Sequence, residues 1–327
     1  MNNILVTGAN GFVGSHICEA LFNRGYTVKA LVRKTSNLAN IKELPVQLIY
    51  GDLCDASSLP DAVRGVDVVI NNAGLTKALK LDDFEKVNAS GTKNILEAIL
   101  QHNPGLRLFM QISSTAACGP APSATPISED HPPNPLTAYG RSKLNSERIA
   151  LSYKDKFPVI AFRPSAVYGP RDTEMLSFFK AVKFGIKPTF GGGDSYINFT
   201  YVKDLALAII KAIEAETISS GVYFVMEKKA YAYSEAGDII SEVLGRKAID
   251  INIPGPILSV AGKVAEEIAR LQKKPMVFSS EKAREIVQRY WLFDSSKIER
   301  ELGFESPTDF RTGVAETIAW YKKEGWL

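Results

Sequence analysis

Three side chains in the middle of the sequence have the types and spacing for proton transfer. Tyr139 and Lys143 are four residues apart, which places them on one face of a predicted helix. A phenol has a reference pKa of about 10, and a neighbouring ammonium favours its ionised form. Ser114 follows a predicted strand, at the edge where open α/β sheets bind ligands. Each feature is common by itself, so the prediction depends on their occurring together.

A glycine-rich loop near the N-terminus has the pattern of a dinucleotide-binding turn. Gly8, Gly11 and Gly14 are spaced G-x-x-G-x-x-G between a predicted strand and a predicted helix. Glycine lets the backbone turn sharply and approach a pyrophosphate, and the helix N-terminus directs N–H groups at the phosphates. Ordinary turns also use glycine, so the strand–turn–helix context carries the argument. The other loop residues expected at the cofactor are Asn10, Phe12 and Val13.

The residues after the second predicted strand favour NADP(H), with NAD(H) as the alternative. An acidic residue here would bind the ribose 2′-hydroxyl of NAD, whereas a nearby Arg accommodates the 2′-phosphate of NADP. The sequence has Arg33-Lys34-Thr35-Ser36 and no acid. We therefore expect Arg33 and Ser36 to contact the phosphate, although a solvated basic loop would have the same composition.

A parallel sheet is needed to position these residues, and the sequence predicts one. Short apolar runs alternate with helical periods in the first half, which is typical of strands joined by crossover helices. Strands are expected at 4–6, 27–32, 46–50, 66–70, 106–112 and 159–162, and helices at 14–23, 84–100 and 138–152. The predicted fold class is α/β, a Rossmann-type doubly wound parallel sheet with a smaller, mainly helical C-terminal substrate lobe.

The alternation becomes irregular after about Pro170, where the substrate lobe is expected to begin. We expect a dinucleotide-binding domain of residues 1–170 and about 194–219, and a substrate lobe of about 171–193 and 220–327. Within 253–256, Pro and Gly are typical of a hinge. Residues 256–271 form an amphipathic helix that we expect to pack on the protein. The alternative is contact with a membrane surface for a lipophilic substrate.

The composition excludes several other classes of protein. The 327 residues are 45% hydrophobic and 23% charged, which does not fit a disordered chain. A formal net charge of +3 is too small for a nucleic-acid-binding surface, and no apolar run is long enough for a membrane-spanning segment. There is no signal-peptide pattern, and the three cysteines and three histidines lack metal-ligand spacing. We therefore expect a cytoplasmic protein with reduced thiols and no metal site.

Taken together, these residues resemble the extended short-chain dehydrogenase/reductases, the NAD-dependent epimerase/dehydratase family. The resemblance runs through nearly the whole chain. The matching stretches are 7–14 (TGANGFVG), Gly51-Asp52-Leu53, Asn72-Ala73-Gly74, Val87-Asn88, Gly91-Thr92, Ser113-Ser114, Tyr139, Lys143, Arg163-Pro164, Val167-Tyr168-Gly169-Pro170, Tyr201-Val202-Lys203-Asp204 and Trp320-Tyr321.

The resemblance implies a role for each matching residue. Tyr139 would be the general acid/base, and Lys143 would hold the nicotinamide ribose and lower the pKa of Tyr139. Ser114, or its neighbour Thr115, would bind the reacting oxygen. Asn88 would hold a proton-relay water, unless it is simply a polar helix residue. Asp52 would border the adenine, unless it caps a turn; further cofactor contacts are expected from Leu53, Asn72, Ala73, Gly74, Ser113, Pro164 and Val167.

Two departures from the sugar-nucleotide members of this family favour carbonyl chemistry. Ala166 stands where many of those enzymes carry Asn, and no acid follows Ser114, as it usually does in the dehydratases. With the basic loop, these departures make the chain similar to the dihydroflavonol reductase and 3β-hydroxysteroid dehydrogenase-like branch. The expected reaction is NADP(H)-dependent interconversion of a ketone and a secondary alcohol. The alternatives are a nucleotide-sugar epimerase or dehydratase with tightly bound NAD, and a non-catalytic NADP-sensing regulator.

The substrate side is predicted from single residues rather than from motifs. A small molecule is the expected partner, and the family resemblance adds a homodimer as a further expectation. Aromatic residues in this region belong more often to the core than to a pocket. The candidate substrate residues are Thr76, Thr115, Tyr168, Arg171, Met175 and Tyr196.

Overall fold

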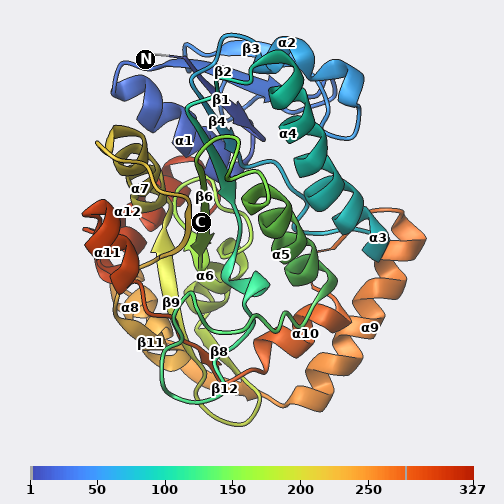
Figure 1. Ribbon diagram of the computed structural model, residues 1–327. Helices are drawn as coiled ribbons and strands as arrows, with labels where there is room; N and C mark the ends of the chain where they lie inside the picture. Colours follow the sequence, from blue (N-terminus) through green and yellow to red (C-terminus); the bar gives the residue numbers. More distant parts are fainter. Residues whose placement is uncertain (1–2, 277) are drawn as a thin grey trace.

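The computed structural model, which describes residues 3–276 and 278–327, is organised around one parallel sheet (Figure 1). Its strand order is β10-β6-β5-β4-β1-β2-β3, and all neighbouring pairs are parallel. The strands are β1 (Asn3–Thr7), β2 (Thr27–Val32), β3 (Gln47–Tyr50), β4 (Val68–Asn71), β5 (Leu108–Ile112), β6 (Val159–Pro164) and β10 (Gly221–Val225). The order reverses between β1 and β4, which confirms the predicted doubly wound sheet.

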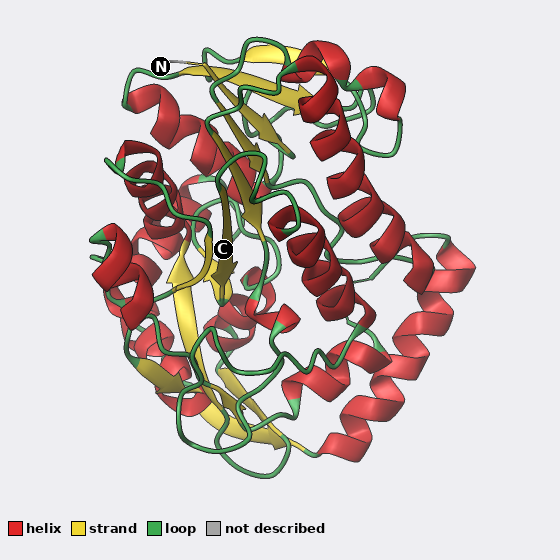
Figure 2. Ribbon diagram, viewed as in Figure 1, coloured by secondary structure: helices red, strands yellow, loops and turns green. Residues whose placement is uncertain are grey.

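Helices cover both faces of this sheet (Figure 2). On one face, α1 (Phe12–Asn23) and α7 (Val202–Glu214) pack around Ile17 and Leu205. On the other face, α2 (Pro60–Val63), α4 (Gly91–His102) and α5 (Ala138–Leu151) pack around Leu96 and other apolar residues. Because both faces are covered, a central strand such as β4 is buried along its whole length.

Most of the predicted elements are found within a few residues of their expected bounds, but one region differs. The helix expected at 84–100 is divided into α3 (Leu81–Phe84), a π-helical segment η2 (Glu85–Ser90) and α4. The residues 253–256, expected to be a hinge, join the end of β12 (Ile249–Ile253) to the start of α9 (Gly255–Gln272), and the hinge stays a prediction. The interruption at η2 carries Asn88, which is consistent with the frequent occurrence of π segments at functional sites.

The second lobe contains two small sheets as well as helices. One sheet is built on β9 (Tyr196–Tyr201), which pairs with β7 (Ala166–Tyr168), β11 (Ala230–Ala232) and β13 (Tyr290–Trp291). The other is the parallel pair β8 (Ile186–Phe190) and β12. The lobe is therefore less helical than the sequence suggested. The remaining helices are α6 (Leu176–Lys183), α8 (Tyr233–Leu244), α10 (Ser280–Ile286), α11 (Ser296–Leu302) and α12 (Phe310–Lys323).

Two strands exchange places relative to the expected domain division. β10, expected in the substrate lobe, pairs with β6 in the seven-stranded sheet, and α11 packs against it. β9, expected in the dinucleotide-binding domain, pairs with strands of the second lobe. We propose a boundary that follows these pairings. Of the helices in the described ranges, none has the length and apolar character needed to span a bilayer.

Candidate active site

The loop between β1 and α1 has the close packing of a dinucleotide cradle. Gly8 has a φ of 62°, and a Cβ there would lie 2.8 Å from the Cα of Ala73. A Cβ on Gly14 would lie 2.1 Å from the Gly8 carbonyl oxygen, so α1 rests directly on the loop. The helix has no side-chain cap at Gly11, which leaves its first N–H groups free for an anion. These features fit a bound pyrophosphate.

Hydrogen bonds hold the ends of β1 and β4 together beside this loop. The Thr7 hydroxyl donates to Asn71 Oδ1 (2.8 Å) and accepts from the Ala73 N–H (2.9 Å). Asn72 Nδ2 donates to the Gly8 carbonyl oxygen (3.3 Å). The structure thus brings Asn72 and Ala73 to the predicted cofactor loop.

The other predicted loop residues have structural partners of their own. Asn10 Nδ2 donates to the Asn37 carbonyl oxygen (3.0 Å), so this amide joins the loop to the segment after β2. Phe12 packs edge-on against His16, with ring centroids 5.8 Å apart. Val13 is half-buried and packs on the core. Their predicted cofactor contacts stay predictions.

A free cation stands at the end of β2. The Arg33 N–H donates to Ser36 Oγ (3.1 Å) and the Ser36 N–H donates back to the Arg33 carbonyl oxygen (2.9 Å), which closes a turn. The exposed Arg33 side chain has no ion pair or hydrogen bond with any residue in the described ranges. An unpaired guanidinium at this position suits a phosphate.

Asp52 lies beside the same strand end but serves a local role. The Gly51 N–H donates to the Val32 carbonyl oxygen (3.0 Å), and Asp52 Oδ1 accepts from the Cys54 N–H (2.9 Å). Asp52 therefore does cap a turn, which was the alternative interpretation. Leu53 is buried against Gly91, where a Cβ would lie 3.0 Å from the Leu53 Cβ.

Close backbone packing brings the catalytic candidates together. Ser114 begins the short 3-10 turn η3 (Thr115–Ala117), and a Cβ on Gly140 would lie 2.4 Å from the Ala116 carbonyl oxygen. Thr137 caps α5, its hydroxyl accepting from the Gly140 N–H (3.1 Å). Because the start of α5 rests on η3, the Tyr139 phenol lies near the Ser114 hydroxyl, which acts to lower the pKa of the phenol.

Lys143 is one turn further along α5, at the end of β5. Its side chain is buried, and Nζ donates to the Ile112 carbonyl oxygen. A Cβ on Gly74 would lie 3.0 Å from Asn88 Oδ1 and 3.7 Å from Nζ, so Gly74 packs closely on Asn88 beside Lys143. Beside it, Ser113 Oγ is buried without a hydrogen-bond partner among the described residues, which suits a hydroxyl kept for a ligand. Pro164 ends the neighbouring strand β6, and Val167 lies in β7.

Asn88 joins the loop after β4 to α5. Its Oδ1 accepts from the Leu75 N–H (2.7 Å), while Nδ2 donates to the Leu75 carbonyl oxygen (3.2 Å) and to Ser142 Oγ (2.9 Å). These contacts make Asn88 a positioning residue for the helix that carries Tyr139. A water-holding role stays a prediction.

Burial shifts the pKa of both central residues, in opposite directions. It raises the pKa of Tyr139 to about 12, against the lowering effect of the Ser114 hydroxyl. It lowers the pKa of Lys143 to about 8, against the attraction of Glu147. The direction for Tyr139 is opposite to the lowering expected from Lys143. At neutral pH the phenol therefore keeps its proton and is a donor.

The second lobe supplies charged residues that the sequence analysis missed. The Thr137 hydroxyl donates to Glu285 Oε1 (2.9 Å), and the Ala138 N–H donates to Glu281 Oε2 (2.9 Å). Lys282 Nζ donates to Glu285 Oε2 (3.0 Å). Glu174, Lys282 and Glu285 all act on the pKa of Tyr139. No motif marks these residues; the only signal was Ser279, whose hydroxyl caps α10.

The predicted substrate residues divide between the site and the core. Thr76 donates to Glu174 Oε1 (3.1 Å) and so belongs near the site, and Thr115 is buried in η3. Tyr168 lies away from the site. It is 1% exposed and packs among aromatic core residues, including Phe310, whose ring centroid is 5.1 Å from its own. This prediction was wrong: the tyrosine fills the centre of the second lobe.

The remaining three substrate candidates also have structural partners. Arg171 Nη2 donates to Glu19 Oε2 (2.8 Å) and Nη1 to Ser15 Oγ (3.2 Å), so this side chain is held against α1 rather than turned to a substrate. Met175 begins α6 and packs on the lobe core. Tyr196 stacks on Tyr290, with ring centroids 6.2 Å apart.

Fold and site define a class of protein: a dinucleotide-binding oxidoreductase with a Rossmann-type sheet. The profile of the NAD dependent epimerase/dehydratase family matches residues 4–225, and the chain belongs to this family. Among its relatives are reductases, dehydratases and epimerases.

Two relatives and one solved structure match nearly the whole chain. Ceramide reductase of Caulobacter vibrioides is 30% identical over 99% of this chain and 96% of its own length. The dTDP-glucose 4,6-dehydratase of an Actinoplanes strain is 27% identical over 98% of this chain and 97% of its own. The crystal structure of gox2253 superposes with a TM-score of 0.83, at 27% identity, over 100% of both chains.

Proposed function

We propose that this protein is an NADP(H)-dependent oxidoreductase that interconverts a ketone and a secondary alcohol. The observation that carries the proposal is the placement of the Tyr139 phenol within the influence of the Ser114 hydroxyl, beside the buried Lys143. A protonated phenol beside a hydroxyl is the arrangement that carbonyl reduction needs, because the carbonyl oxygen gains negative charge as the carbon accepts hydride.

The chain's own residues then divide the remaining work. NADPH, when bound, would supply the hydride that the carbonyl carbon accepts. Tyr139 donates its proton to the carbonyl oxygen, and the Ser114 hydroxyl donates a hydrogen bond to the same oxygen, so the ketone becomes an alcohol. Lys143 donates one N–H to the Ile112 carbonyl oxygen, and its other two N–H groups remain for the nicotinamide ribose. Solvent returns the proton to Tyr139.

Two further observations support the cofactor and the substrate class. The unpaired Arg33 guanidinium favours NADP(H) over NAD(H). No acid follows Ser114, and the similarity to a ceramide reductase supports reduction as the reaction and a lipid as the class of substrate. We keep the homodimer and the cytoplasmic location as predictions, which size-exclusion chromatography with light scattering and cell fractionation would test.

A thermal-shift screen tests this proposal. We expect NADPH to raise the melting temperature more than NADH, and UDP-sugars to have no effect. Stabilisation by a UDP-sugar, together with NAD that remains bound through purification, would instead identify an epimerase or dehydratase.

A further inference from the structure

Helix α9 carries large apolar side chains on the side that faces away from the protein. Its packed side consists of Leu258, Gly262, Ala265 and Ala269, which are mostly small. A surface helix normally directs its larger apolar residues inward. Here the exposed ones recur at three- and four-residue intervals and form one stripe about 80° wide. This outer stripe consists of Ile257, Val260, Val264, Ile268 and Leu271, which are 58%, 63%, 53%, 39% and 83% exposed.

Close contacts with α10 fix the rotation of α9. A Cβ on Gly262 would lie 2.8 Å from the Ser280 backbone nitrogen, so only glycine allows this approach. Glu266 accepts from the Ser280 N–H (2.8 Å) and from its hydroxyl (3.0 Å). Because α9 cannot turn about its axis without breaking these contacts, the packing itself keeps the outer stripe exposed on the surface.

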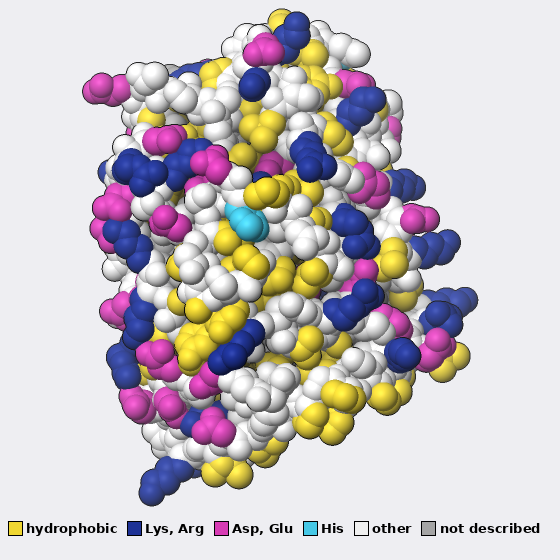
Figure 3. Space-filling view, turned by 60° about the horizontal axis from the view of Figure 1, so that its bottom comes forward, with side chains coloured by type: hydrophobic (Ala, Val, Ile, Leu, Met, Phe, Trp, Pro, Cys, Tyr) yellow, Lys and Arg dark blue, Asp and Glu magenta, His cyan; other side chains and the backbone are white. Residues whose placement is uncertain are grey.

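The segment that leads into α9 is also apolar and exposed. β8 and β12 pair Ile186 with Ile249, Pro188 with Ile251 and Phe190 with Ile253, and the alternation of strand side chains puts all six on one face. Ile249 is 68% exposed, and Phe184, just before β8, is 79% exposed. Figure 3 shows hydrophobic side chains in a row along its lower right edge, on the side where α9 lies in Figure 1.

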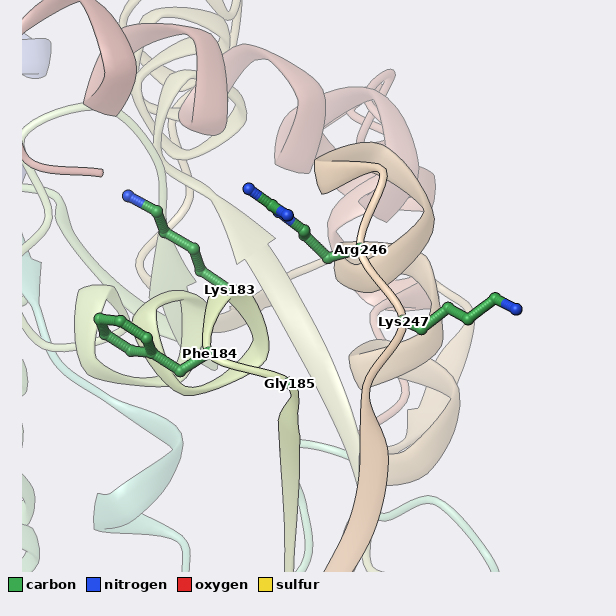
Figure 4. A pocket seen from close by; sticks show the side chains of 5 residues that line it. All are labelled: Lys183, Phe184, Gly185, Arg246 and Lys247. Carbon is green, nitrogen blue, oxygen red and sulfur yellow. The ribbon is translucent and has the colours of Figure 1, made fainter.

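Basic side chains accompany these apolar groups. Residues 246–274 contain six basic and three acidic side chains, an excess as large as the formal net charge of +3 of the whole chain. Lys183, Arg246 and Lys247 surround a hollow of about 470 Å³ that also includes Phe184. Figure 4 shows Lys183 and Arg246 extending toward the same space, whereas Lys247 points away from it.

We propose that α9 is a docking surface for an anionic lipid membrane. The outer stripe would lie in the interface between headgroups and acyl chains, and the basic residues would meet the lipid phosphates. This occupant is favoured over a second copy of the chain because basic residues outnumber acidic ones by six to three in this segment, and a net positive charge opposes self-association and attracts an anionic surface.

Docking in this way would place the candidate active site close to the lipid. α10 packs on α9, and its Glu281 and Glu285 bond the residues that begin the Tyr139 helix. A ketone dissolved in the membrane would then reach the site without crossing bulk water. The docking surface itself does not depend on the proposed reaction.

Vesicle co-sedimentation with a matched pair of variants tests the docking surface. V264E puts a charge in the centre of the outer stripe, and S259E puts the same charge on the exposed polar side of the same helix. Vesicles of phosphatidylcholine with one-third phosphatidylglycerol should bind the unmodified chain and S259E alike, and V264E about tenfold less. Binding should weaken as salt is raised. Both variants should keep the thermal melting temperature, because both positions are exposed.

Two outcomes would overturn the docking surface. One is equal binding of V264E and S259E, and the other is no binding of the unmodified chain to these vesicles. If the second outcome occurs and V264E alone changes the oligomeric state in light scattering, the outer stripe is an interface between copies. Vesicle binding requires no turnover, so its failure is separable from failure of the proposed reductase activity.

Discussion

Both ends of the molecule place a glycine where two backbones touch, but they leave different chemistry exposed. Gly14 lets α1 rest on the glycine loop, and unpaired N–H groups and the Arg33 guanidinium remain for a phosphate. Gly262 lets α9 rest on the start of α10, and large apolar side chains remain outside. In each region the close packing fixes the orientation of a helix. The orientation then determines which ligand the surface suits.

The largest expected effect comes from removing the proton donor. Tyr139→Phe should lower turnover of a ketone by about a thousandfold, because general acid catalysis supplies about 10²–10⁴-fold. NADPH binding, measured by fluorescence titration, should remain nearly unchanged. The control is the same substitution at Tyr50, which is 50% exposed. Undiminished turnover in Tyr139→Phe would remove this residue from the mechanism.

A buried histidine in α1, next to the glycine loop, should make the stability of the protein fall at acidic pH. His16 Nε2 donates to the Pro170 carbonyl oxygen (2.8 Å), and burial lowers the pKa of His16 to about 4 from 6.5. Between these values the unfolded chain binds more protons, so this contribution to stability is lost as the pH falls. Between pH 7 and pH 4 the free energy of unfolding should therefore fall by about 3 kcal/mol less in His16→Gln than in the unmodified chain.

Urea unfolding at several pH values measures this difference. Asp172 acts in the opposite direction, since burial raises its pKa to about 7, but it is common to both proteins and cancels in the comparison. The half-buried His131, replaced by Gln, is the control. Parallel curves for His16→Gln and the unmodified chain would contradict the assigned neutral, donating His16.

The cofactor preference depends on Arg33. Arg33→Ala should weaken NADPH binding by about 10- to 100-fold, because a hydrogen bond to a charged group contributes about 1.5–3 kcal/mol. NADH affinity should not change, since NADH lacks the 2′-phosphate. Isothermal titration with both cofactors measures this, with Lys42→Ala on the exposed surface as the control. Equal losses for both cofactors would assign Arg33 to a different contact.

The lobe side should show a smaller effect, confined to the substrate. Glu285→Gln keeps an acceptor for the Thr137 hydroxyl but removes the charge that pairs with Lys282. We expect the KM for a ketone to rise by up to about tenfold, the value of one hydrogen bond. The Kd for NADPH should stay constant, as it should in the exposed control Glu324→Gln. If the Kd for NADPH changed instead, the effect would not be confined to the substrate, and this prediction would be contradicted.

The contrast between the glycine loop region and the second lobe also explains which features the sequence could predict. The glycine loop and the Tyr139–Lys143 pair depend on spacing within one turn or one helix, so their residue types show them directly. The central strands were equally visible, because burial on both faces makes each one a continuous apolar run.

The second lobe was harder to predict because its site residues depend on tertiary contacts. Glu281 and Glu285 are ordinary helix residues until α10 docks on Thr137 and Ala138. Tyr168 belongs to a motif, yet it lies in the core because Gly313 of α12 opens a space against its ring. Burial also reversed the direction expected for the pKa of Tyr139, and burial cannot be read from a four-residue spacing.

Isotope transfer tests the central claim most directly. The protein would be supplied with a ketone and with NADPH carrying deuterium at the transferable position of the nicotinamide, and the products would be analysed by mass spectrometry. The reductase account predicts a secondary alcohol that contains one deuterium, with one NADP⁺ formed for each alcohol. In a parallel reaction the protein would be supplied with a sugar nucleotide; its conversion to an epimer or dehydrated product with no net oxidation of the cofactor, while the ketone gains no deuterium, would contradict the account.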